Sequence, residues 1–281
     1  MAPRQSSTVR GRRLRRELHR LRTTAGLTTD EVAEQLTWHR SKVSRIENGH
    51  SGISPGDVRE LLDVYGVTGE QVDALVKLAR EARQKNWWFA YGDVLPDDYV
   101  GLEAEAVSIR TFEGQFVPGL LQTEGYARAV IHAGRDAVDA DDVERRVEAR
   151  LARQTLLTRD DPVRLWAIVD EGALRRPAGG REVMRAQLDH LAKAAELPNV
   201  ELQVLPYSSG AHAGMSGPFA ILNFVEPAEG DVVYVENETS SLFLEKPQEI
   251  ERYTLMFTHL LAKALDPDAS VPYLARLADE L

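Results

Sequence analysis

The sequence predicts an α+β protein, in which an all-α N-terminal domain precedes a larger mixed α+β domain with an antiparallel or mixed sheet. Up to about residue 82, apolar residues recur at spacings of three and four, the pattern of amphipathic helices. After residue 96 come six short runs rich in β-branched and aromatic residues, four of them without intervening helices. With 281 residues the chain exceeds most single domains, so two domains are expected.

Composition narrows the class of protein further. Cysteine is absent, which excludes disulfides, thiolate chemistry and cysteine-ligated zinc. No apolar run approaches 18 residues, and the first twenty residues lack the apolar segment of a secretory signal. We therefore expect a cytoplasmic protein without a membrane partner.

The net charge of −10 conceals two regions of opposite sign. Residues 1–48 hold 11 Arg or Lys and 5 Asp or Glu, a net +6, whereas residues 49–281 hold 23 basic and 39 acidic groups, a net −16. This division predicts a basic N-terminal domain that meets an anion and an acidic remainder with another task.

The first predicted helix has one apolar stripe, formed by Leu14, Leu18, Leu21 and Ala25, and Gly26 is expected to end it. The other faces of this helix carry six arginines: Arg12, Arg13, Arg15, Arg16, Arg20 and Arg22. A second helix begins at Thr28 or Thr29, with acidic residues in its first turn. It is expected to bury Val32, Ala33 and Leu36.

A third helix is predicted from about His39 to Glu47. At 100° per residue, Val43 and Ile46 share one side, whereas Ser41, Ser44 and Arg45 lie opposite, flanked by Arg40 and Lys42. Arginine pairs with guanine edges, serine donates to bases or phosphates, and lysine favours phosphate. The alternative is a solvated basic face without a ligand.

The segment LTTDEVAEQLTWHRSKVSRIENG, residues 27–49, resembles the lambda-Cro-like XRE family of helix-turn-helix repressors, and the match covers about Leu14 to Val67. The resemblance implies five helices, with the third entering the major groove of double-stranded DNA. It implies base contacts by Arg40, Ser41 and Arg45 and phosphate contacts by Thr29, Ser44 and Asn48. One position departs from the family, because Thr37 stands where the turn usually has glycine.

Two further helices complete the N-terminal domain, which we place at residues 1–82, with residues 1–8 expected to be a disordered arm. Ser54 or Asp57 caps the fourth, whose inner side carries Val58, Leu61, Leu62 and Tyr65. The fifth covers about residues 69–84 and carries Val72, Leu75, Val76 and Ala79. Residues 83–96 form an aromatic-rich junction, whose aromatic side chains pack between domains, in a dimer interface or in the core of the next domain.

The C-terminal domain is placed at residues 97–281. Its predicted strands are SIRTFEGQFV, VRLWAIVD, VELQVLP, FAILNFV, VVYVE and SLFLE. Its predicted helices lie at about 97–107, 123–133, 142–157, 181–195, 248–264 and 269–280. The helix from Gln248 has a continuous apolar face, wide enough to cover such a sheet.

The C-terminal domain lacks the common catalytic sequence motifs. It has no P-loop, dinucleotide-binding glycine pattern, G-x-S-x-G elbow or H-E-x-x-H motif. Asp170 and Glu171 follow a strand and His212 lies in a glycine-rich loop, a combination compatible with a hydrolytic or metal site. An aspartate at a strand end more often caps the next helix. We therefore expect no catalytic residues, no cofactor and no metal.

Several C-terminal segments, among them FVPGLLQTEGYARAVI and VELQVLPYSSGAHAGMSGPFAILNF, resemble the antitoxin-like C-terminal domain of actinobacterial transcriptional regulators, formerly a domain of unknown function. The match runs from about Asn86 to Ala264. The resemblance implies a regulator that binds a small partner protein encoded nearby. Candidate residues for binding this partner or a ligand lie in two loops and at the strand that follows: Asp170, Glu171, Arg175, His212, Met215 and Phe219.

The function expected from the sequence is sequence-specific DNA binding by a nucleoid-associated transcriptional regulator, a repressor of developmental or antitoxin-like type, modulated through its C-terminal domain. A homodimer is expected because one recognition helix reads a half-site. Two alternatives remain open. One is an antitoxin that neutralises a cognate toxin, and the other is a DNA-binding metabolite sensor with an enzymatic C-terminal domain.

Overall fold

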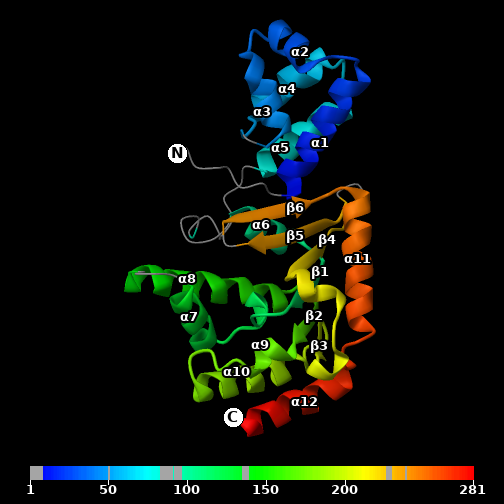
Figure 1. Ribbon diagram of the computed structural model, residues 1–281. Helices are drawn as coiled ribbons and strands as arrows, with labels where there is room; N and C mark the ends of the chain where they lie inside the picture. Colours follow the sequence, from blue (N-terminus) through cyan, green and yellow to red (C-terminus); the bar gives the residue numbers. More distant parts are fainter. Residues whose placement is uncertain are drawn as a thin grey trace. The chain divides into compact units, whose positions relative to one another are not determined.

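A computed structural model describes residues 9–49, 51–82, 91, 97–134, 139–225, 230–237 and 239–281. These residues fall into two compact units (Figure 1). The first contains six helices among the described residues: α1 (Val9–Thr24), α2 (Thr29–Gln35), α3 (Arg40–Glu47), α4 (Pro55–Val64), α5 (Glu70–Glu81) and α6 (Asp97–Glu105). The second, from residue 106 onward, contains the sheet and the remaining helices.

Capping residues set the helix starts in the first unit. Thr28, and not Thr29, caps α2: its Oγ1 accepts from the backbone N–H of Glu31, and the Glu31 carboxylate accepts from the Thr28 N–H at 2.8 Å. In α4 the two candidates work together, because Ser54 is the cap and Asp57 closes the same reciprocal capping box. Gly26 follows α1 with a φ of +74°, as a helix-ending glycine requires.

The core of the first unit is formed by the apolar stripes of its helices. Leu14, Leu18, Val43 and Ile46 are all buried there, and α2, α4 and α5 contribute further buried residues to the cluster. Two details of the predicted first helix were wrong. Ala25 is exposed, because α1 ends before it, and Arg12 is buried although the helical plot places it on a polar face.

The sheet of the second unit has six strands in the order β3-β2-β1-β4-β5-β6. Their bounds are β1 (Ser108–Glu113), β2 (Arg164–Asp170), β3 (Val200–Leu205), β4 (Phe219–Asn223), β5 (Val232–Asn237) and β6 (Ser240–Leu244). β1, β2 and β3 pair in parallel, whereas β1–β4, β4–β5 and β5–β6 pair antiparallel. The predicted α+β class is confirmed, and the sheet is mixed.

Helical crossovers explain the parallel half of this sheet, because parallel neighbours cannot be joined by a tight turn. The connection from β1 to β2 contains α7 (Glu124–Ala133) and α8 (Ala140–Arg153), and that from β2 to β3 contains α9 (Glu171–Arg175) and α10 (Arg181–Ala194). Two helices, α11 (Pro247–Leu261) and α12 (Pro267–Glu280), follow β6.

The sheet has helices on both sides. Figure 1 shows α11 along one side and α7, α8 and α10 on the other. On the α11 side, Phe257 and Leu260 pack with Phe112, Phe219 and other buried strand residues. The expectation that the apolar face of this helix covers the sheet is confirmed, since Ile250, Tyr253, Leu261 and Ala264 pack against the same cluster.

Two expectations lie largely outside the described residues. These are the arm at residues 1–8 and, apart from Tyr91, the aromatic junction at 83–96. Within the described part of the chain, no helix has the length and apolar character needed to cross a membrane.

Candidate DNA-binding interface

Helix α3 buries one face and exposes the other, as its sequence predicts. Its N-cap is His39, whose Nδ1 accepts from the backbone N–H of Ser41 at 3.3 Å. Val43 and Ile46 are fully buried in the core of the unit. Their burial fixes the rotation of α3 about its axis and therefore decides which side chains face solvent.

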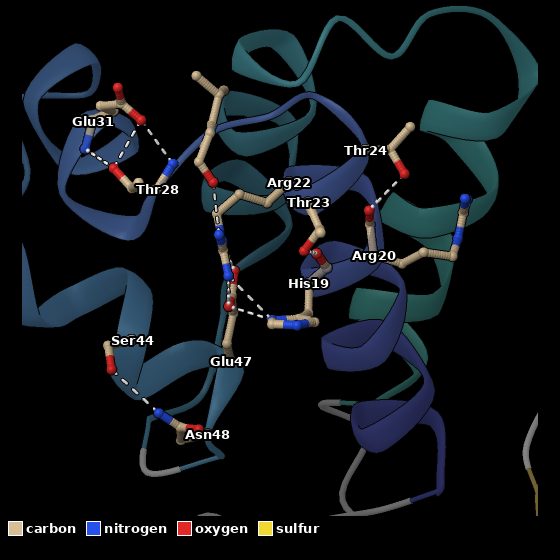
Figure 2. Close-up of polar contacts among 11 residues, drawn as sticks. His19, Arg20, Arg22, Thr23, Thr24, Thr28, Glu31, Ser44, Glu47 and Asn48 are labelled. Atoms are coloured by element: carbon tan, nitrogen blue, oxygen red, sulfur yellow. Dashed lines mark hydrogen bonds and ion pairs between the residues drawn. The ribbon is translucent and has the colours of Figure 1, made fainter.

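The solvent side of α3 presents two unengaged guanidinium groups. Arg40 and Arg45 are exposed, and neither side chain has a hydrogen-bond or ion-pair partner within the described residues. Ser41 and Ser44 lie on the same helix, and Asn48, its C-cap residue, donates to the Ser44 hydroxyl at 3.2 Å (Figure 2). Thr29, the first residue of α2, is half-buried.

Lys42 differs from the other predicted DNA contacts because it is engaged within the domain. Its Nζ lies 2.6 Å from Oδ1 of Asp57 and 3.4 Å from the centre of the Trp38 ring. This contact joins α3 to α4 and to the turn before α3. Although burial raises the pKa of Asp57, the contacts with Lys42 and Ser54 more than offset it, so the pKa lies below its ordinary value.

The turn between α2 and α3 contains the only positive φ of a non-glycine residue in the part of the chain that the structure describes: Thr37, at +54°. The Thr37 N–H donates to Glu34 O and the Trp38 N–H donates to Ala33 O, the paired bonds of a left-handed helix ending. A β-branched residue is strained in this region, which glycine enters freely. Thr37, in place of the glycine usual in the family, therefore introduces backbone strain into the turn that sets the orientation of α3.

A buried carboxylate fixes the other end of α3. Glu47 receives two hydrogen bonds from Arg22, at 2.7 and 2.8 Å, and lies 2.8 Å from Nδ1 of His19 (Figure 2). Burial raises the pKa of Glu47, but the hydrogen bonds and charges of Arg22 and His19 outweigh it, so the pKa is lowered. The contact between Arg22 and Glu47 ties α3 to α1, and the Arg22 guanidinium also donates to the carbonyl of Leu27 in the turn after α1.

The sequence reasoning missed this clamp and assigned Arg22 to a solvent-facing side of α1. The Arg22 side chain is only 12% exposed and that of Glu47 only 7% exposed. The available signal was weak: Glu47 is one of only five acidic residues in the first 48, and it ends the recognition helix. Nothing in helical spacing pairs it with a residue 25 positions earlier.

In the second unit, the structure brings Asp170 and His212 together. His212 Nε2 lies 3.4 Å from Asp170 Oδ2, and His212 Nδ1 accepts from the Gly214 N–H at 3.2 Å. Because Nδ1 accepts from the Gly214 N–H, Nε2 is the nitrogen that faces Asp170 as a donor. Asp170 also caps α9 through the Gly172 N–H, as the capping interpretation of this residue predicts.

The loop that carries His212 packs closely on the sheet. A Cβ on Gly214 would lie 2.3 Å from the ring of Phe112, so this position accepts only glycine without a shift of the loop. The His212 ring contacts Phe112 edge-on, and Phe219 is buried beside Phe112. Met215, in contrast, is 73% exposed at the surface of the loop.

Glu171 and Arg175 take part in a different set of contacts. The Glu171 carboxylate accepts from Arg175 and, at 2.7 Å, from the backbone N–H of Tyr207. Arg175 also donates to Glu280 of α12 at 2.8 Å. Burial raises the pKa of Glu171, yet the bonds from Tyr207 and Arg175 lower it overall, as expected for a carboxylate held ionised to join α9 to the segment that follows β3.

An open hollow of about 480 Å³ adjoins His212 on the side of α11. Its lining consists of three alanines and three residues with polar side chains: Ala211, His212, Ala213, His259, Ala262 and Lys263. The Lys263 amine is held by the carbonyls of Ser209 and Ala211 at 3.0 and 2.8 Å. No group of three or more metal-ligating side chains is placed to hold a metal ion among the described residues.

Two families match the chain. A helix-turn-helix domain matches residues 13–75, and a domain of unknown function, DUF5753, matches residues 96–276. No curated protein and no solved structure matches it. The first match covers most of α1, all of α2 to α4 and the first half of α5, and it identifies a DNA-binding regulator. Because the second match spans well over half of its residues, the chain belongs to the DUF5753 family and carries that domain behind an N-terminal helix-turn-helix domain.

Proposed function

We propose that α3 is the recognition helix of a sequence-specific transcriptional repressor and that its exposed face reads base edges in the major groove. The observation that carries this proposal is the pair of exposed guanidinium groups, Arg40 on the flank of α3 and Arg45 opposite its buried face, which are unengaged within the described residues. A guanidinium already held by a carboxylate would first have to lose that partner. Arg22 illustrates this engaged state, since Glu47 holds it.

Selection from random double-stranded DNA with the full chain tests this proposal. We expect one enriched sequence, and we expect Arg45→Ala to bind it about 1–3 kcal/mol more weakly, as loss of a bidentate base contact does. Arg252→Ala is the matched control, because Arg252 is an exposed arginine of α11 and its loss changes the net charge equally. No enriched sequence, or equal losses for the two variants, would refute sequence reading by α3.

We further propose that the C-terminal domain is not an enzyme and controls DNA binding through a small partner protein or ligand. The hollow beside His212 and the exposed Met215 support a binding role for the 207–217 loop. The engagement of Glu171 and Arg175 in fold-stabilising contacts supports their structural use. Proteins that co-purify with the full chain, but not with a His212→Ala, Met215→Ala double variant, would identify such a partner. If the same partner were recovered equally with the wild-type chain and with the double variant, the loop would not be part of the partner-binding site.

The proposed repressor acts as a homodimer, because a single α3 covers only a half-site and paired recognition helices about 34 Å apart read two. The net charge of −16 on residues 49–281 supports confinement of the DNA contact to the N-terminal domain, since the acidic region repels phosphate. Sedimentation of the full chain on its selected DNA tests the stoichiometry. One chain per symmetric site would contradict the dimer.

A further inference from the structure

The two edges of the sheet are treated differently by the fold. At the β3 edge, the Val204 N–H donates to Oγ of Ser270 at 3.0 Å, and the Val204 carbonyl accepts from the Leu265 N–H at 2.8 Å. The segment that leads into α12 therefore satisfies outward backbone groups of β3. This edge is closed to another strand.

The β6 edge is open within the described residues. The backbone of β6 bonds to β5 on its inner side, and none of its groups has a partner on the outer side. Ser240, Ser241 and Leu242 are exposed, and Leu242 is 49% exposed. An open strand edge presents a row of unpaired donors and acceptors to any neighbouring strand.

Proteins usually protect such an edge with charged side chains, proline or a bulge. β6 reads Ser-Ser-Leu-Phe-Leu and contains neither a charge nor a proline. Its five residues pair continuously with β5 from Ser240 to Leu244, without a bulge. Residues 49–281, to which this edge belongs, carry a net charge of −16, so two copies of this region repel each other wherever acidic side chains come close. The β6 strand itself carries no charge, so two β6 edges can pair without bringing like charges on the strands together.

The strand is also rigidly supported. The Phe243 ring lies 5.1 Å from the Tyr234 ring of β5, and Leu244 and Val235 pack against the α11-side core. Two copies of a strand that pair antiparallel about a twofold axis are self-complementary, because residue i of each copy then meets residue j of the other and residue j meets residue i. Pairing about Leu242 would place the two Leu242 side chains next to each other on one face of a continuous sheet.

From these observations we propose that β6 is a dimerisation surface that pairs antiparallel with β6 of a second copy of this chain. The proposal gives a location to the dimer proposed above, and it is tested without DNA, so that it fails or succeeds independently of operator recognition. The occupant is a second copy, and a strand from a different protein is one of the outcomes of the test.

The experiment measures the dimer dissociation constant of the full chain by sedimentation. Leu242→Lys and Leu242→Asp, each alone, place like charges at the pairing axis, and we expect each to weaken the dimer at least tenfold, about the effect of one unfavourable charge contact. Mixing the two variants puts Lys opposite Asp and should restore the dimer. Leu255→Lys is the matched control, because Leu255 is 54% exposed on α11 and should leave the dimer unchanged.

Three results would overturn the proposal. These are a wild-type chain that is monomeric, single variants that dimerise as well as the wild type, and mixed variants that fail to reassociate although each keeps the wild-type circular dichroism and melting temperature. A monomeric wild type that binds a foreign strand at β6 would assign the edge to a different protein. Loss of DNA binding with an intact dimer would instead count against the proposed function alone.

Discussion

Replacing Thr37 with glycine should stabilise the N-terminal unit. Thr37 holds a φ of +54°, is exposed, and has no side-chain hydrogen bond within the described residues, so no contact is lost with its side chain. The left-handed conformation costs a non-glycine residue roughly 1–2 kcal/mol. The greater freedom of glycine in the unfolded chain offsets roughly 0.5–1 kcal/mol of the strain relieved. The net gain is about 0.5–1 kcal/mol.

Hydrogen exchange of the full chain measures this gain where it should appear, in the amides of α2 and α3. Exchange there should slow about two- to fivefold if these amides exchange through unfolding of the unit, the factor that corresponds to that free energy. Thr37→Val is the matched control, because valine keeps the β-branched shape and the strain and should bring no gain. The assignment of strain to this turn would be refuted if the glycine variant exchanged faster than the wild type. It would also be refuted if the valine variant exchanged as slowly as the glycine variant.

Three further predictions concern ionisable side chains that are buried or paired within the fold. Glu47→Gln should destabilise the N-terminal unit by about 3 kcal/mol, because Arg22 is left buried without its carboxylate, and thermal unfolding measures this loss. The lowered pKa of Glu47 means that its stabilisation is complete above pH 4.5 and is lost as the pH falls through the folded-state pKa, so the variant should lose part of the acid dependence. Burial, and then Glu236, raise the pKa of Glu113 to about 8, so the C-terminal unit should lose stability between pH 4.5 and 8. Glu113→Gln should flatten this slope, which is below the limit of about 1.4 kcal/mol per pH unit because Glu113 is partly exposed. Lys42→Met should lower stability more than operator affinity, and a drop in the salt dependence of binding would instead make Lys42 a phosphate contact.

Much of the fold follows from local patterns. The spacing of apolar residues located α1 to α5, and the β-branched runs located all six strands, because burial on one face imposes a period on the sequence. The sequence does not distinguish an antiparallel sheet from a mixed one. In the structure the sheet is mixed, because helical crossovers lead from β1 to β2 and from β2 to β3 and make these pairs parallel. Pairing between strands distant in the chain leaves no local pattern in the sequence.

Helix geometry predicts which side chains of α3 are buried and which are exposed at the candidate interface. The plot of α3 separated Val43 and Ile46 from Arg40 and Arg45, and their observed burial and exposure agree with it. It did not show that Lys42 is engaged, because its partner Asp57 comes from α4.

Contacts between distant segments explain the remaining omissions. The pairing of Arg22 with Glu47 depends on the packing of α1 against α3, and that of Asp170 with His212 depends on the loop after β3. Capping and periodicity act over a few residues, whereas these pairs are 25 and 42 residues apart in the chain. Only the folded arrangement brings them together.

The most direct test of base reading by α3 is the affinity of Arg45→Lys for the selected operator and for random DNA. Lysine keeps the positive charge but cannot make the paired hydrogen bonds of a guanidinium. If Arg45 reads a base, operator affinity falls by about 1–3 kcal/mol while affinity for random DNA is unchanged. Wild-type operator affinity in the lysine variant, or an equal loss on both DNAs, would contradict recognition by this face of α3.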